Sequence, residues 1–241
     1  MIEAETVLIC CVNRSNDMVI IDYNMNQVRK IEGLPGLNYL GMGIRPTISE
    51  SGRKKLLALW LRGNNQAVLL DIKTMEELDR APLFGTGDNY KTVIPVCCAY
   101  SSDSWCGVYI QQQEPYIVWI VNGESKEIAQ VSRLIPEGKM IYQLYLSPGA
   151  DYIVALFGTD KRIETSRLFL VVLKFGGKFK LMDFKRLDQL PRGYVPTLHK
   201  NYSGTLFAVN CGQRILLYTL SAEGTLKSTV DIPSGKQGRC R

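Results

Sequence analysis

The sequence predicts an all-β protein built from about five repeats of a four-stranded antiparallel sheet, and three observations lead to this prediction. Short apolar segments, rich in β-branched and aromatic residues, alternate with clusters of Gly, Asn, Ser and Asp, as strands alternate with turns. The strongest segments come in pairs, whose second members begin at residues 18, 67, 116, 168 and 214. This spacing of about 50 residues marks an internal repeat. No long segment of the sequence has a helical periodicity.

Sheets that repeat at this interval around a common axis form a β-propeller. We expect one over residues 1–233, with repeats at 1–33, 34–84, 85–134, 135–190 and 191–233, and a flexible basic tail at 234–241. Less than about a tenth of the chain should be helical, far less than in an average globular protein.

The four strands expected in each repeat differ in polarity. Central strands are buried on both faces and read as near-continuous apolar runs, whereas an outer edge strand is polar because this discourages pairing with other chains. The first strands are expected at Leu37–Ile48, Thr92–Tyr100, Met140–Leu146 and Gly193–Lys200. The second are expected at Val7–Asn13, Lys55–Leu61, Trp105–Gln111, Tyr152–Gly158 and Thr205–Cys211. The third are expected at Met18–Asn24, Ala67–Lys73, Tyr116–Asn122, Leu168–Lys174 and Arg214–Leu220. The fourth are expected at Gln27–Glu32, Glu76–Leu83, Lys126–Val131, Lys178–Lys185 and Leu226–Ile232.

Segments with a tight-turn composition precede the paired strands, at Ser49–Gly52, Ser101–Ser104, Ser147–Asp151 and Asn201–Gly204. The run Leu144-Tyr-Leu-Ser-Pro-Gly-Ala-Asp-Tyr-Ile-Val-Ala-Leu156 resembles the inner strand, turn and second strand of WD40-like propellers. Ala67–Ile72 lies where those repeats place an apolar strand that ends in an aspartate, although their Trp-Asp and Gly-His pairs are absent here. The resemblance implies a propeller fold.

The first repeat lacks a clear inner strand, because only six residues precede Val7 and the tail after Ile232 is polar and glycine-rich. Another chain supplies this strand, or the ring is open, or the chain is a portion of a larger propeller, or Glu3–Thr6 forms a very short strand. We expect a partner strand beside Val7–Asn13, because an unpaired apolar edge invites pairing. The candidate pairing edge consists of Val7, Leu8, Ile9, Cys10, Cys11 and Val12.

Inner strands and the loops over the central channel are where a propeller enzyme would carry its catalytic groups. The expected inner strands offer no acid, and His199, expected to hydrogen-bond the turn that follows it, is the only histidine of the chain. Glycoside hydrolysis needs two facing carboxylates, and a zinc site needs clustered ligands. The seven cysteines form no Cys-x-x-Cys motif and are expected to be buried thiols in a reducing compartment. We therefore expect no enzyme activity, no metal and no cofactor.

The positive charge of the chain is concentrated in one repeat. The whole chain carries a net charge of +6, and residues 161–192 contain nine basic and three acidic residues. The basic residues are Lys161, Arg162, Arg167, Lys174, Lys178, Lys180, Lys185, Arg186 and Arg192. Such a patch attracts acidic proteins, anionic lipids or nucleic acid, or it is simply a solvated edge. Phe175, Phe179 and Phe184 would stack on bases if exposed, and would equally suit the core.

An acidic N-terminus and the absence of a long apolar run indicate a cytoplasmic protein, or a nuclear one. The sequence thus predicts a non-catalytic propeller scaffold that holds other protein subunits in a larger intracellular complex, because the loops of a rigid disc supply contact sites. Two alternatives are open: a binder of anionic membrane lipid or nucleic acid at the basic patch, and a hydrolase that uses the central channel.

Overall fold

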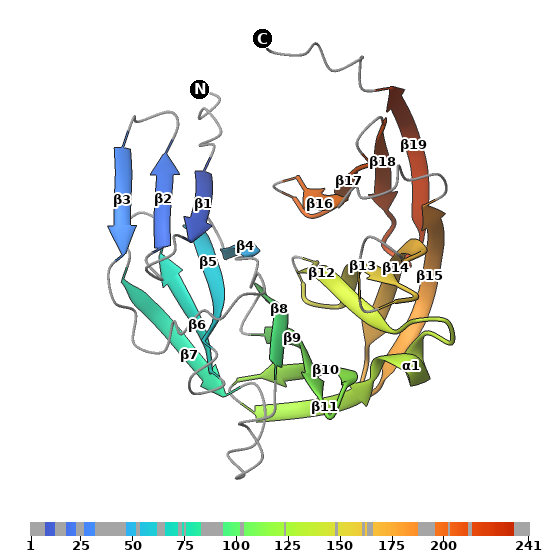
Figure 1. The fold of residues 1–241 in the computed structure, drawn as a ribbon, viewed down its shortest axis with the longest axis horizontal. Coiled ribbons are helices and arrows are strands. Elements are labelled where there is room, and N and C mark those ends of the chain that lie inside the picture. Colours follow the sequence, from blue (N-terminus) through green and yellow to red (C-terminus); the bar gives the residue numbers. More distant parts are fainter. Residues whose placement is uncertain are drawn as a thin grey trace.

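A computed structural model shows five antiparallel sheets that follow one another along the chain (Figure 1). It describes residues 8–12, 18–22, 27–31, 47–51, 54–61, 66–71, 74, 76–82, 94–101, 104–122, 124–147, 149–160, 162, 166–187, 196–201, 203–211 and 214–233. Only the backbone is described for the residues before Leu69 and for Leu70, Pro82, Ile94 and Pro95. Among them no helix has the length and apolar character to cross a membrane.

The first two sheets come from the N-terminal part of the chain. Sheet 1 has three strands, in the order β1 (Leu8–Val12), β2 (Met18–Asp22) and β3 (Gln27–Ile31). Sheet 2 has four strands, in the order β4 (Thr47–Ser51), β5 (Lys54–Leu61), β6 (Gln66–Asp71) and β7 (Glu77–Pro82).

The other three sheets each have four strands in chain order. Sheet 3 contains β8 (Ile94–Ser101), β9 (Ser104–Gln111), β10 (Glu114–Val121) and β11 (Glu124–Gln130). Sheet 4 contains β12 (Met140–Leu146), β13 (Tyr152–Gly158), β14 (Leu168–Phe175) and β15 (Phe179–Leu187). Sheet 5 contains β16 (Thr197–Lys200), β17 (Leu206–Asn210), β18 (Arg214–Leu220) and β19 (Leu226–Pro233).

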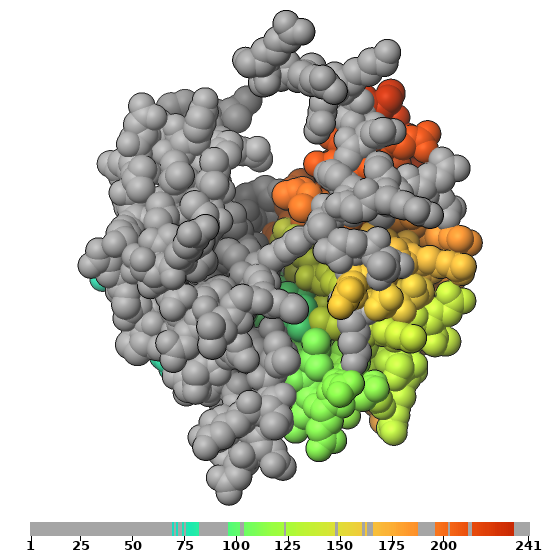
Figure 2. All heavy atoms as spheres, viewed as in Figure 1, coloured from blue at the N-terminus to red at the C-terminus, as the bar shows by residue number. Residues whose placement is uncertain are grey.

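The sheets are arranged radially along an arc, with sheets 1 and 5 at its two ends (Figure 1). The first strands lie innermost, where β4 contacts β8, β8 contacts β12 and β12 contacts β16. The space-filling view shows the described parts of sheets 3, 4 and 5 following one another in this order, from green to red (Figure 2). The expected propeller architecture is thus confirmed. The third strands predicted from the repeat are the equivalent strands β6, β10, β14 and β18.

Three apolar clusters hold the arc together, each between two consecutive sheets. The first joins sheets 2 and 3 through Leu69 and Trp105, the second joins sheets 3 and 4 through Trp119 and Phe157, and the third joins sheets 4 and 5 through Val172 and Phe207. We call the face that each sheet turns toward the next sheet its forward face. Side chains alternate between the two faces along a strand. The odd-numbered residues of a central strand therefore belong to one cluster, and its even-numbered residues belong to another.

Two expectations about local structure were wrong. Ser49, Glu50 and Ser51 were expected in a turn, but they belong to β4, where Glu50 lies opposite Lys55 of β5. The fourth strand of the third repeat was expected to include Val131, but that residue begins the short helix α1 (Val131–Leu134). This helix is one turn long and is closed by the hydrogen bond from Ile135 N to Val131 O, and Val131 is its buried residue.

Every four-stranded sheet has a β-bulge at the same place in its outer strand. The register shifts between Leu69 and Leu70 in sheet 2, between Trp119 and Ile120 in sheet 3, between Val172 and Leu173 in sheet 4, and between Leu217 and Tyr218 in sheet 5. The residues that pair with the third strand just before this shift are Asp79, Glu127, Asp183 and Val230. They are structurally equivalent, and each one belongs to the forward face of its sheet.

Candidate interaction surfaces

The described inner strands carry few groups suited to chemistry. Glu50 of β4 is a carboxylate residue that the expected strand bounds had left out, and β8 and β12 contribute none. Within the described part of the chain, no three His, Cys, Asp or Glu residues are grouped so that they could hold a metal ion.

The cysteines of sheet 3 are buried and lie on opposite faces. Cys97 and Cys106 belong to the cluster toward sheet 4, and Cys98 belongs to the cluster toward sheet 2. Burial raises the pKa of the Cys98 thiol to about 12 and that of Cys106 well above its ordinary value. These thiols are therefore protonated near neutral pH, and a protonated thiol is neither a nucleophile nor a metal ligand.

His199 is exposed on β16, and its Nε2 lies 3.0 Å from Thr197 Oγ1. The expectation that it bonds the following turn was wrong, because Asn201 satisfies that turn itself. Asn201 Oδ1 accepts hydrogen bonds from the backbone N–H groups of Thr205 and Leu206 at 3.0 and 2.9 Å.

The structure divides the basic residues of the fourth repeat instead of gathering them on one face. Arg162 and Arg167 lie in the connection between β13 and β14, while Lys161 and Arg192 lie outside the described residues. Residues that pair directly across two strands share a face. Lys185 pairs with Leu170, on the forward face, whereas Arg186 pairs with Phe169, on the other.

Three exposed lysines remain close together, around the hairpin that joins β14 and β15. Lys174 lies directly opposite Lys180, and Lys178 belongs to the turn between them. The ammonium of Lys174 also sits 5.5 Å from the centre of the Tyr152 ring. Like charges that face each other across a strand pair are destabilising, so this hairpin carries a local excess of positive charge.

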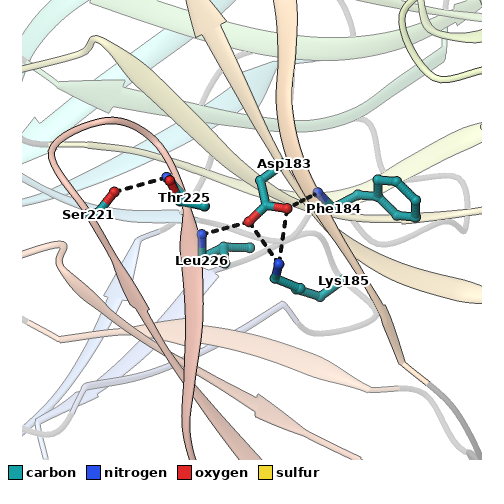
Figure 3. A network of polar contacts seen from close by, with 6 residues as sticks. All are labelled: Asp183, Phe184, Lys185, Ser221, Thr225 and Leu226. Atoms are coloured by element: carbon teal, nitrogen blue, oxygen red, sulfur yellow. Dashed lines mark hydrogen bonds and ion pairs between the residues drawn. The ribbon is translucent and has the colours of Figure 1, made fainter.

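Asp183 forms an ion pair with Lys185, which neutralises one charge of the candidate basic patch, and it also joins two sheets (Figure 3). The Lys185 ammonium lies 3.1 Å from the Asp183 carboxylate, which also accepts a hydrogen bond from Phe184 N at 2.8 Å. The second carboxylate oxygen accepts the backbone N–H of Leu226, in β19 of the next sheet, at 2.8 Å. Asp183 therefore ties the outer strand of sheet 4 to the outer strand of sheet 5.

The three phenylalanines of this hairpin have different environments. Phe179 is buried, and Phe175 stacks on Trp119 with 4.4 Å between ring centres. Phe184 is 55% exposed, but it pairs with Val171 and so lies on the opposite face from Lys174 and Lys180. The hairpin therefore does not interleave aromatic rings with its lysines, as a base-stacking surface would.

The strand edge proposed from the sequence lies at one end of the arc. Val7 lies outside the described residues, and Leu8–Val12 form β1, which pairs in register with β2 from Leu8 opposite Asp22 to Val12 opposite Met18. In the described part of the chain no strand pairs with the other side of β1.

The other end of the arc carries a surface that the sequence reasoning missed. Val230 and Ile232 of β19 are 45% and 43% exposed, on the forward face of sheet 5. The signal was present in the sequence, because β18 reads Arg-Ile-Leu-Leu-Tyr-Thr-Leu, as apolar as a strand that is buried on both faces.

No family model matches the sequence, and no curated protein matches it either. Solved structures with a similar fold do exist. Hydrazine synthase of Kuenenia stuttgartiensis matches with a TM-score of 0.56 at 13% identity, over 95% of this chain and 71% of that one. A streptogramin B lyase matches with a TM-score of 0.54 at 13% identity, over 96% and 67%. The Dos1 propeller matches with a TM-score of 0.52 at 10% identity, over 94% and 58%. Together with the radial sheets, these likenesses show that the chain has a β-propeller fold.

Proposed function

We propose that this chain is a non-catalytic scaffold, a WD40-like propeller subunit that holds other proteins in a larger intracellular complex. The observation that carries the proposal is the edge of β1 with which no described strand pairs. Among the described residues, the other four sheets have four strands each, whereas sheet 1 has three, with β1 at its edge.

The residues of β1 explain why this edge calls for a partner. The strand Leu-Ile-Cys-Cys-Val is wholly apolar, whereas solvent-facing edges in natural proteins usually carry charges, prolines or bulges. The outer strands of the other sheets fit that rule, because β11 and β15 are rich in charged residues. An apolar edge with free N–H and C=O groups is suited to binding an added strand.

Hydrogen exchange of the amides of Leu8 to Val12 tests the proposal. In a five-residue edge strand, the amides that point away from β2 exchange fast in the isolated chain, and an added strand protects them in the native assembly. The amides of β10, which lies between two strands of its sheet, serve as the internal control and stay protected in both. Full protection of β1 in a monodisperse monomer would refute the need for a partner.

The hairpin of Lys174, Lys178 and Lys180 supports a second candidate function, the binding of an anionic surface such as a lipid membrane. Lys174 and Lys180 face each other, and electrostatic attraction to anionic lipids amounts to about 1 kcal/mol per basic residue near the surface. The triple change to Glu should abolish binding to vesicles that contain phosphatidylserine. The control variant replaces the exposed Lys126, Lys139 and Lys227 by Glu, which changes the net charge by the same amount elsewhere on the surface. This variant should still bind the vesicles, and its binding should weaken as the salt concentration increases. If both variants lost vesicle binding equally, the net charge of the chain would explain the binding and the lysine hairpin would not be a specific site.

A further inference from the structure

In the part of the chain that the structure describes, the last sheet of the arc is covered on one face only, although its strands have the composition of a sheet that is covered on both. In sheet 4, all of β13 and the first six residues of β14 are buried, whichever face they belong to. In sheet 5, β17 alternates between buried and half-buried residues, and in β18 only Tyr218 is buried. A near-continuous apolar strand is typical of a sheet with both faces packed.

The strand register defines the residues of the uncovered face. Three rows of directly paired residues cross this face from β17 to β19, and two of them contain most of its apolar side chains. One row is Asn210, Ile215 and Ile232, and the other is Ala208, Leu217 and Val230. His199 extends the second row onto β16. None of the apolar residues in these rows belongs to a core cluster of the described part of the chain.

This face has an apolar centre and a polar rim. Ile215, Leu217 and Ala208 are half-buried, and Val230 and Ile232 are more exposed. Thr197 and His199 extend the two rows onto β16, and Lys227 lies in the neighbouring row, opposite Thr219. An exposed apolar patch with a polar rim is typical of a protein–protein contact.

The position of Val230 shows that this face is equivalent to the forward faces of sheets 2, 3 and 4. Val230 is the equivalent of Asp79, Glu127 and Asp183 at the outer-strand bulge. Two of these acids bind the next sheet: Asp79 Oδ2 accepts the Trp105 indole N–H at 3.0 Å, and Asp183 Oδ2 accepts Leu226 N at 2.8 Å. The uncovered face of sheet 5 is therefore the forward face, which in sheets 2, 3 and 4 packs against a following propeller sheet.

We propose that the forward face of sheet 5 is covered by a further propeller blade, a four-stranded antiparallel sheet that belongs to a partner polypeptide. This inference rests on the proposed function as a complex subunit, and it names what the partner contributes. It continues an interface that the chain already forms three times. At the other end of the arc, β1 offers an edge with which no described strand pairs (Figure 1), and this edge is a contact separate from the forward face of sheet 5.

A second copy of this chain suits the two ends less well. If sheet 1 of one copy packed on sheet 5 of the next, each addition would leave the same two ends bare, and such head-to-tail contacts form filaments unless the rotation closes a ring. Val230 is apolar, whereas the equivalent residues Asp79 and Asp183 accept an N–H group from the next sheet. The blade that covers Val230 therefore finds no hydrogen-bond acceptor at this position.

Photo-crosslinking tests this inference in the native assembly. A benzoylphenylalanine is placed at Val230, and the matched control places it at Ile128, which is 46% exposed on the outer strand of sheet 3. We expect position 230 to crosslink to a β-strand of a different polypeptide, and position 128 to give no crosslink to that strand. In parallel, Val230→Glu with Ile232→Glu should lose the partner on gel filtration, whereas Ile128→Glu retains it. Circular dichroism verifies that both variants are folded.

The other outcomes separate the two proposals. A crosslink to a second copy of this chain refutes the partner blade and makes the face a self-association surface. An assembly that forms through β1 while Val230 stays uncrosslinked refutes this inference and leaves the proposed function standing. A chain that is monomeric in its native extract, with β1 fully protected from exchange, refutes both.

Discussion

Replacing Asp183 should weaken the contact between sheets 4 and 5. In Asp183→Ala, the backbone N–H of Leu226 loses its acceptor, and Leu226 is only 2% exposed. A buried hydrogen bond to a charged acceptor contributes about 1.5–3 kcal/mol, and a donor that is left unsatisfied has a similar cost. The Lys185 ion pair adds little, because the Lys185 side chain is 36% exposed and such pairs contribute at most about 1 kcal/mol.

The free energy of unfolding should therefore fall by about 2–3 kcal/mol in Asp183→Ala. For a chain of this size the melting temperature should fall by about 5–10 °C. Asp183→Asn keeps a carbonyl oxygen that can accept the Leu226 N–H, so about half of the loss should be recovered. Urea denaturation followed by tryptophan fluorescence measures both variants.

Asp231→Ala is the matched control for this measurement. Asp231 pairs with Arg214 at 3.1 Å, but the two side chains are 42% and 54% exposed, so the loss should stay below about 1 kcal/mol. If Asp183→Ala destabilises the chain no more than Asp231→Ala does, the hydrogen bond to Leu226 does not join the two sheets as described.

Three further predictions concern single positions. Gly224→Ala should destabilise the chain by at least about 2 kcal/mol more than Gly177→Ala in thermal melts. Both glycines have a positive φ, but a Cβ on Gly224 would lie 2.5 Å from Tyr152 Cε1, whereas a Cβ on Gly177 meets nothing within 4 Å. Cys98 should resist iodoacetamide at pH 8 in the folded chain and react on unfolding, as peptide mapping would show, because a pKa raised from 9.0 to about 12 leaves about a thousandfold less thiolate; rapid labelling of the native chain would contradict its burial. His199→Ala should cost at most about 1 kcal/mol and leave the metal content of the protein unchanged in elemental analysis; a stoichiometric metal that disappears with His199 would show that a site was missed.

The repeat in the sequence was enough to predict the central strands, because each of them is apolar on both faces. β10 and β14 carry this signal most clearly, and they lie where the sequence places them. β4 was misread because Ser-Glu-Ser has the composition of a turn. Its strand conformation comes from pairing with β5, and such tertiary pairing overrides the weak strand propensity of these residues.

Contacts between sheets could not be predicted in the same way. Asp183 reaches Leu226 across 43 positions of sequence, and no local pattern marks either residue as a partner. The basic cluster also appeared uniform in the sequence, whereas alternation along β15 places Lys185 and Arg186 on opposite faces, and only Lys185 forms an ion pair with Asp183. The helix α1 has no side-chain cap at Gln130, so the sequence lacked the usual signal of a helix start.

The polar links between sheets 4 and 5 bear directly on the inferred partner blade. Gln143 of β12 exchanges two hydrogen bonds with the backbone of Leu198, at 2.6 and 3.1 Å. Tyr152 OH donates to Ala222 O at 2.8 Å, and Asp183 accepts from Leu226 N. These links follow the contact from the inner strands to the outer ones. Apolar packing is non-directional, whereas hydrogen bonds at both ends of the contact fix the angle of sheet 5. Its forward face is therefore held in one orientation before any partner arrives, so Asp183→Ala should weaken docking of the partner blade even at temperatures where the chain stays folded.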